Sequence, residues 1–123
     1  IIQISSQSAE LSSLSQSASF DGEVSLQTSN QVLSSQKAIF TYDDSTKKFA
    51  GLEMKGKVIL SQGSRRVTSE DLKIDFATQK LTFSGQPRLF QDEDELVGDK
   101  IIFLDGGKRV KVEKVKAKGK SPE

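Results

Sequence analysis

A spacing of about thirty residues recurs three times in this chain and keeps apolar side chains in register. Counted forward from Gly22, Gly56 and Gly85, apolar residues stand two, four, eleven, sixteen and eighteen positions on in all three stretches. A repeat of this length is typical of one supersecondary unit that is stacked several times. Because a single unit cannot close its own core, each must bury its apolar face on a neighbour. We therefore expect function to lie along the stacked surface and not at a single pocket.

The composition excludes several kinds of protein. The chain has 123 residues, which fits one domain, and 18 basic against 17 acidic residues give no overall field for a polyanionic partner. It contains no Cys and no His, so thiolate chemistry, the usual general base and the commonest metal ligand are missing. We expect a protein that is not an enzyme and that holds no cofactor and no metal.

Period-two alternation of apolar and polar residues predicts an all-β fold. Each unit carries three expected strands, which are separated by turns rich in Gly, Ser, Asp and Asn. The expected strands cover residues 24–26, 38–42 and 49–52 in the first unit, 58–60, 72–76 and 81–83 in the second, and 88–90, 101–103 and 110–112 in the third. Leu33, Val67 and Leu96 lie out of phase with the apolar positions that follow them. We therefore expect a bulge or kink near Ser35, Ser69 and Gly98.

The chain is predicted to be a single domain, 1–123, with repeats at 22–55, 56–84 and 85–115 and a basic tail at 116–123. Residues 4–11 align without gaps on residues 33–40, so residues 1–19 are interpreted as a partial, degenerate repeat. A Ser-rich linker is the alternative, since eight of the first nineteen residues are Ser.

The predicted architecture is a pair of antiparallel sheets folded face to face, an open jelly-roll-like structure with an apolar interior groove. The unequal spacing of the units, 34 and then 29 residues, argues against a strict β-helix. If the ends are not sealed, the terminal strands are open edges that can pair with another copy or with another protein.

Residues 56–85 and 85–112 resemble the OstA-type repeat of the periplasmic lipopolysaccharide-transport proteins. The shared elements are a Gly-x-Val/Pro-x-Leu opening, a charged turn, an Ala/Leu/Ile-x-Phe/Ile strand, and a Gly that closes one unit and opens the next. The resemblance covers roughly residues 20–115. Within the family the chain is most similar to the bridging component, while the periplasmic domain of the membrane-anchored component is the alternative.

The resemblance implies a periplasmic protein whose apolar groove shields the acyl chains of lipid A. It also implies partners: lipopolysaccharide, other lipopolysaccharide-transport proteins that dock through edge strands, and a second copy in head-to-tail self-association. It brings no catalytic residues. The positions that match the groove are Val24, Leu26, Phe40, Tyr42, Val58, Leu60, Leu72, Ile74, Phe76, Leu89, Ile101 and Phe103.

Each of these interpretations has a plainer alternative. The groove positions can simply form a core, as in a structural β-repeat or adhesin segment without a ligand. The seven basic residues of 108–120 suit lipid A phosphates or an acidic partner, but also a lysine-protected edge strand with a solvated tail. This segment has no aromatic residues for base stacking, so we expect no nucleic-acid partner. The acidic run 92–95 is interpreted as a solvated turn, and Arg65 with Arg66 as a surface pair.

Overall fold

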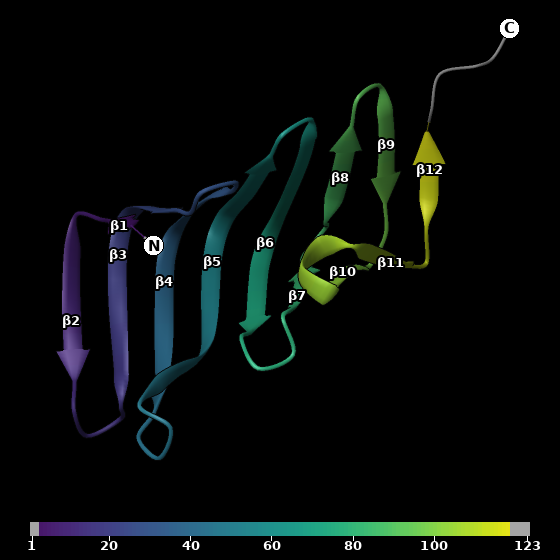
Figure 1. Cartoon of the computed structure of the whole chain (residues 1–123). Coiled ribbons are helices and arrows are strands. Elements are labelled where there is room, and N and C mark those ends of the chain that lie inside the picture. Colours follow the sequence, from purple (N-terminus) through teal and green to yellow (C-terminus); the bar gives the residue numbers. More distant parts are fainter. Residues whose placement is uncertain (1–2, 119–123) are drawn as a thin grey trace, which may run out of the picture.

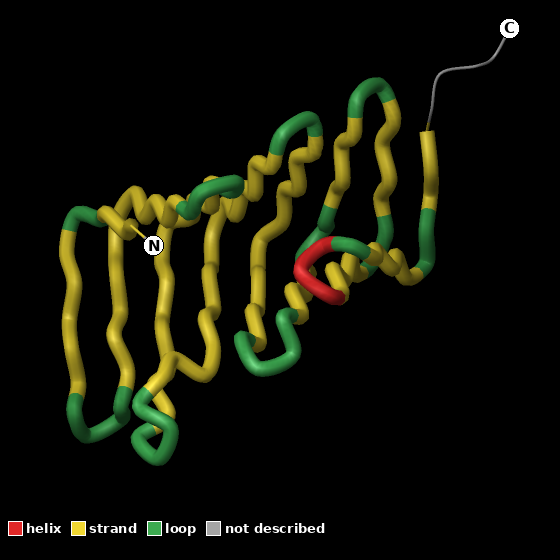
Figure 2. The backbone as a smooth tube through the Cα atoms, in the orientation of Figure 1, coloured by secondary structure: helices red, strands yellow, loops and turns green. Residues whose placement is uncertain are grey.

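The chain folds as one antiparallel β-sheet that bends back on itself (Figure 1). The computed structural model describes residues 3–118, which contain no α-helix, and Figure 2 shows strand along most of that length. The predicted all-β, open jelly-roll-like class is confirmed, with one difference: the two expected sheets are two layers of a single folded sheet. The elements are β1 (Gln3–Ser5), β2 (Ser8–Ser12), β3 (Ser17–Gln27), β4 (Val32–Asp43), β5 (Lys48–Gln62), β6 (Arg65–Asp75), β7 (Lys80–Ser84), β8 (Arg88–Gln91), β9 (Asp94–Val97), β10 (Lys100–Leu104), the 3-10 turn η1 (Asp105–Gly107), β11 (Arg109–Glu113) and β12 (Lys116–Lys118).

The four long strands β3 to β6 each run through both layers, and the shorter strands belong to one layer each. In Figure 1, β8, β9 and β12 of the upper layer stand above β7, β10 and β11 of the lower layer. In pairing order, the upper layer consists of β1, 24–27 of β3, 32–35 of β4, 58–62 of β5, 65–69 of β6, β8, β9 and β12. The lower layer consists of β2, 17–21 of β3, 37–43 of β4, 48–55 of β5, 71–75 of β6, β7, β10 and β11.

Glycines of the repeat form the corner at which the sheet folds. Gly56 and Lys57 of β5 lie opposite the single residue Glu70 of β6, so the ladder shifts register there as in a β-bulge. Gly56 has φ +83, a left-handed conformation that glycine adopts at little cost. The ladder between β4 and β5 also shifts between Ser34 and Lys37, which confirms the kink expected near Ser35. In the bulge between β5 and β6, the extra residue belongs to β5, the strand that contains Gly56.

Serine hydroxyls tie the two arms of the corner together. Ser35 and Ser69 are buried, and each Oγ donates to the backbone oxygen of the residue two positions on, at 2.9 Å. Ser6 donates to the oxygen of Ser8 in the same way, also at 2.9 Å. Residues 3–12 therefore turn the same corner as the aligned residues of β4.

A single core fills the space between the inner faces of the two layers. Val58 and Val67 of the upper layer and Met54, Phe83 and Phe103 of the lower layer have no exposed surface. They belong to one cluster that receives side chains from β3 through β10. No helix within residues 3–118 is long and apolar enough to cross a membrane.

The corner geometry generates a first prediction. Gly56→Ala should lower the free energy of unfolding by more than the roughly 1–2 kcal/mol that the left-handed conformation itself costs an L-residue. The added methyl would also lie 3.0 Å from the Cβ of Gln36, whereas a methyl at Gly63, where φ is +59, would meet nothing within 4 Å. Urea denaturation of Gly56→Ala and Gly63→Ala compares the two costs. Equal losses would show that the corner does not depend on close approach.

Candidate functional site: the mouth of the apolar interior

All twelve predicted groove residues lie on the inner faces of the two layers, but they differ in exposure. Tyr42, Ile74 and Phe76 are half-buried. The other nine are buried: Val24, Leu26, Phe40, Val58, Leu60, Leu72, Leu89, Ile101 and Phe103. These nine pack against one another in the core, and their contact with lipid stays a prediction.

The lower layer is longer than the upper layer in the N-terminal half, which leaves part of its inner face uncovered. Strand β4 places residues 37–43 in the lower layer but only 32–35 in the upper layer, and β5 places 48–55 against 58–62. Tyr42 lies near the end of the lower segment of β4 and the exposed Phe49 near the start of that of β5, whereas Ile74 lies near the end of β6 and Phe76 just after it. We refer to Tyr42, Phe49, Ile74 and Phe76 as the mouth residues.

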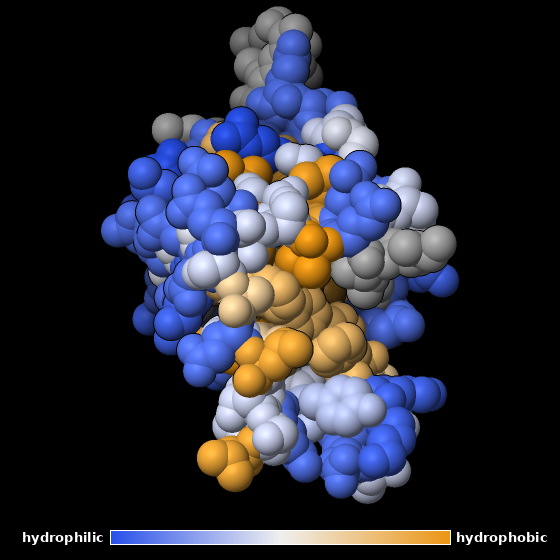
Figure 3. All heavy atoms as spheres, turned by 90° about the vertical axis from the view of Figure 1, so that its left-hand side faces the viewer, coloured by the Kyte–Doolittle hydropathy of each residue, from blue (hydrophilic) through white to orange (hydrophobic). Residues whose placement is uncertain are grey.

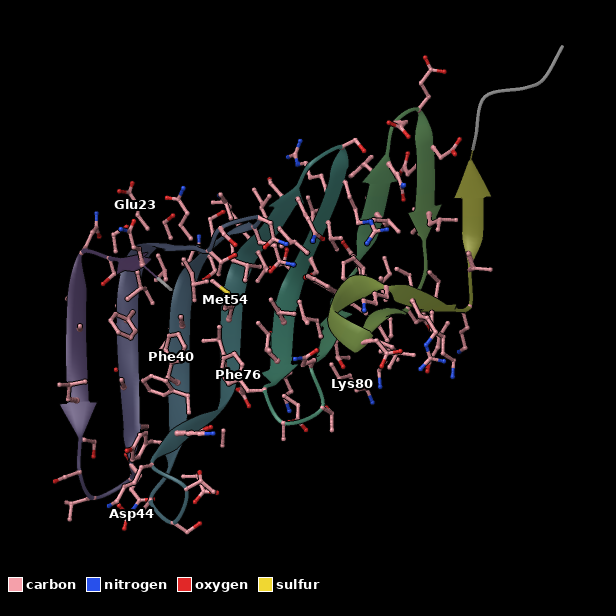
Figure 4. The ribbon with its side chains drawn as sticks, in the orientation of Figure 1. Glu23, Phe40, Asp44, Met54, Phe76 and Lys80 are labelled. Carbon is pink, nitrogen blue, oxygen red and sulfur yellow. The ribbon has the colours of Figure 1, made fainter. Side chains whose placement is uncertain are left out.

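Aromatic side chains join the mouth to the core. Phe40 contacts Phe49, Phe20 and Phe76, with ring centroids 5.0, 5.8 and 6.5 Å away. The Phe40 and Phe76 rings are stacked at 9°, and both side chains are labelled in Figure 4; Phe40 lies on β4 and Phe76 just after β6, with β5 between those two strands. Tyr42 meets Phe49 edge-on at 5.8 Å. Phe49, with 53% of its surface exposed, gives this cluster a solvent-facing apolar end.

Phe49 and Phe20 were not predicted as groove residues. Gly51 pairs with Thr41, but the next pair along the ladder is Phe49 with Tyr42, so the strand contains an extra residue at Ala50. This irregularity turns Phe49 to the same face as Leu52, although the two residues are three positions apart and regular alternation would place them on opposite faces. Period-two counting places Phe49 on the outer face, and the isolated Gly51 within the strand is the signal that could have indicated the bulge.

A surface recess of about 970 Å³ borders the mouth on the outside of the lower layer. Outer-face residues such as Ile39, Lys73 and Thr82 line it together with Phe49 and Phe76. Because its lining mixes charged and apolar groups, we regard this recess as distinct from the apolar interior.

The turn between β4 and β5 is ordered by Asp43. Its Oδ1 accepts hydrogen bonds from the Ser45 hydroxyl at 2.7 Å and the Ser45 backbone N–H at 2.9 Å. These bonds favour the charged form, and the Ser45 hydroxyl is the largest cause of a lowered Asp43 pKa. Asp44 pairs with Lys47 at 3.1 Å in the same turn. These contacts order the turn that connects the mouth residues Tyr42 and Phe49.

The two rims meet in the C-terminal half of the molecule. Arg65, at the upper rim, donates from Nη1 to the backbone oxygen of Gly107 at 3.1 Å, and its Cζ lies 5.3 Å from the centre of the Phe103 ring. Interpreting Arg65 and Arg66 as a surface pair is therefore wrong for Arg65, which is half-buried against an apolar ring. Arg66 is exposed, as expected.

Both ends of the folded sheet present unpaired strand edges within residues 3–118. β1 and β2 pair only with β3, and β11 and β12 pair only with β10 and β9. Figure 3, which views the N-terminal end, shows a column of apolar atoms between polar borders. Leu11 of β2 is 81% exposed at this end.

The basic C-terminal segment lies on edge strands. Lys111 of β11 and Lys116 of β12 are exposed, a placement in keeping with the lysine-protected edge. Positions 119–123, which include Lys120 and most of the predicted basic tail, lie outside the described residues.

The acidic run forms the turn between β8 and β9. Asp92 and Asp94 are exposed, whereas Glu95 pairs with Arg88 at 3.2 Å. Across residues 3–118, no group of three or more acidic, His or Cys residues is arranged to hold a metal ion.

The fold and the mouth define a class of protein: an open, folded-sheet jelly-roll with an apolar interior and free strand edges. The family model described as "LptA/(LptD N-terminal domain) LPS transport protein" matches residues 3–105, and the chain belongs to this family of lipopolysaccharide-transport proteins. The resemblance seen in the sequence is thereby confirmed. The family is one of transport proteins and not a known class of enzyme.

A solved structure shares the fold. It is LptH of Pseudomonas aeruginosa, described as the LptA homologous periplasmic component of the lipopolysaccharide transport device, with a TM-score of 0.86. The match covers 98% of this chain and 96% of that chain at 14% sequence identity, so it is evidence for the fold alone. Comparison with curated protein sequences finds no match.

A second prediction concerns the turn at the mouth. Because the Asp43 pKa is lowered in the fold, the stabilisation from these hydrogen bonds is present above the unfolded pKa and is lost as the pH falls through the folded pKa. Ser45→Ala should raise the Asp43 pKa by removing the largest cause of its lowering. An NMR pH titration of the Asp43 carboxyl measures the midpoint. An unchanged midpoint would contradict the assigned cause.

Proposed function

We propose that the chain is a periplasmic lipopolysaccharide-binding bridge protein that shields the acyl chains of lipid A in its apolar groove. The proposal is supported by membership of the lipopolysaccharide-transport family and by the half-open aromatic mouth. The observation that carries it is the exposure of Phe49, which continues through Phe40 into the core. Acyl chains would first meet the mouth residues and then pass between the layers.

The proposed binding needs no specific polar contact. Removing apolar surface from water is worth about 25 cal/mol per Å², which favours burial of a hydrocarbon chain of any exact structure. When an acyl chain inserts, contacts among the buried groove residues would be replaced by contacts between those residues and the chain. This exchange makes the transfer reversible, so a chain can move on to the groove of a neighbouring protein.

Continuity of the groove would come from edge-to-edge docking. The free edges of β1 and β2 at one end and of β11 and β12 at the other can each extend the sheet of a partner β domain, or of a second copy. The apolar column at the N-terminal end would then be covered by the interior of that partner (Figure 3). The periplasmic domain of a membrane-anchored family member, which would dock through one end only, is the alternative proposal.

Lipid contact at the mouth is the third prediction. A photo-crosslinking amino acid at Phe49 should form an adduct with lipopolysaccharide, and Phe76→Glu should reduce that adduct several-fold because a charge then lies on the path of the chain. The same photo-crosslinker at Lys37, on the outer face of the lower layer, is the control. Adduct yield is read on gels, and circular dichroism verifies folding.

A sealed structural repeat would give no adduct at Phe49, and that result would overturn the proposed function. Phe103 is unsuitable as the charged position, although it belongs to the predicted groove. Its side chain has no exposed surface, so a charge there would prevent folding and thereby abolish any binding.

Docking through the N-terminal edge gives the fourth prediction. Leu11→Lys places a charge on the free edge strand β2 and should weaken association with a partner β domain or a second copy at least tenfold. Leu14→Lys is the matched control because Leu14, 99% exposed, lies in the turn after β2 and not on the strand edge. Analytical ultracentrifugation measures the association. Equal weakening by both variants would contradict docking through β2.

A further inference from the structure

The interior is open at one half of the molecule and closed at the other. In the N-terminal half, the upper-rim turn formed by residues 28–31 makes no hydrogen bond or ion pair to the lower layer within the described residues; its polar groups bond among themselves. In the C-terminal half, Arg65 bridges to Gly107 at 3.1 Å and covers the Phe103 ring. We refer to Arg65, Phe103 and Gly107 as the rim clasp.

The rim clasp stands beyond the end of the aromatic mouth. The aromatic cluster extends from Phe20 of β3 to Phe76, just after β6, which is three strand spacings, or roughly 14 Å across the sheet. Phe103 lies two strands farther on, in β10, which follows β7 in the lower layer. A chain that enters at the mouth and extends across the sheet therefore reaches the rim clasp next.

The rim clasp is closed, but a polar atom beside it lacks a hydrogen-bond partner among the described residues. Gln62 lies beside it at the upper rim, and its Oε1 is buried without a hydrogen-bond partner in the described part of the chain. The same oxygen is 3.8 Å from where a Cβ would stand on Gly107. An unpaired buried oxygen disfavours the closed arrangement, and separation of the rims would let water reach it. Opening of the rim clasp would thus relieve this unpaired oxygen.

We propose that Arg65 sets the inner limit of the chain-binding site. The closed rim clasp stops an acyl chain that has filled the mouth, and the clasp must open before a longer chain can extend past it. This inference rests on the proposed function. It assigns a length limit to the site: chains that fit within the mouth bind with the clasp closed. Chains that extend farther must separate Arg65 from Gly107.

Neutral alkyl maltosides of graded chain length test the limit, because their sugar headgroup stays outside and cannot pair with Arg65. Displacement of the dye 1-N-phenylnaphthylamine, below the micelle-forming concentration, gives each Kd. In the unmodified protein Kd should fall about fourfold for each methylene buried and then stop falling once the chain fills the mouth. In Arg65→Ala the fall should continue, so a chain two methylenes past the limit should bind about fifteenfold tighter than in the unmodified protein.

Arg66→Ala is the matched control, since it removes the neighbouring, exposed guanidinium and should leave the limit where it is. Hydrogen exchange supplies a readout without ligand: amides of residues 105–109 should exchange several-fold faster in Arg65→Ala, while those of β3 should not change. An unmoved length limit in Arg65→Ala, or unchanged exchange at 105–109, would overturn the proposal. If exchange responds but no maltoside displaces dye from any variant, the lipid-binding function fails and the clasp stands only as a structural contact.

Discussion

The corner in the sheet is the constraint on which the rest of the structure depends. Each bulge, such as Gly56-Lys57 opposite Glu70, bends the strand pair in the same sense. Because the bends fall on one line, the inner faces of both layers are brought together along the whole molecule. A unit without its neighbours would have the bend but no opposing apolar face to cover. This explains why each strand from β3 to β6 has either a repeated glycine or a buried serine at the point where it passes from one layer to the other.

The same corner leads to an open interior in one half of the molecule and to a closed interior in the other. Where the lower layer is longer than the upper, its inner face continues past the core as the aromatic mouth. Where η1 carries Gly107 toward Arg65, the rims touch and Phe83 and Phe103 pack edge to face at 5.3 Å without exposure. Unequal strand lengths and one turn thus convert a regular repeat into a wedge with an open half and a closed half.

Much of this arrangement could be predicted because burial follows the repeat. Alternation and the common offsets from Gly22, Gly56 and Gly85 placed all twelve groove positions on the inner faces, and the phase change at Leu33 indicated the kink. Phe49 could not be found in this way, since the bulge at Ala50 is invisible to a period-two count. Arg65 escaped for a different reason: its partner Gly107 is 42 residues away and lies in the other layer, and a contact of that kind leaves no local pattern.

Within the interior, the residues that stabilise the fold differ from those that an arriving chain can contact. The nine buried groove residues hold the two layers together, so substitutions there change stability before they change anything else. The mouth residues contribute less to the core because part of their surface already faces water. They are also the first apolar surface that an arriving chain can touch. Under the proposed function, a lipid chain would therefore first contact residues that contribute little to stability, and the rim clasp would limit how far that chain extends.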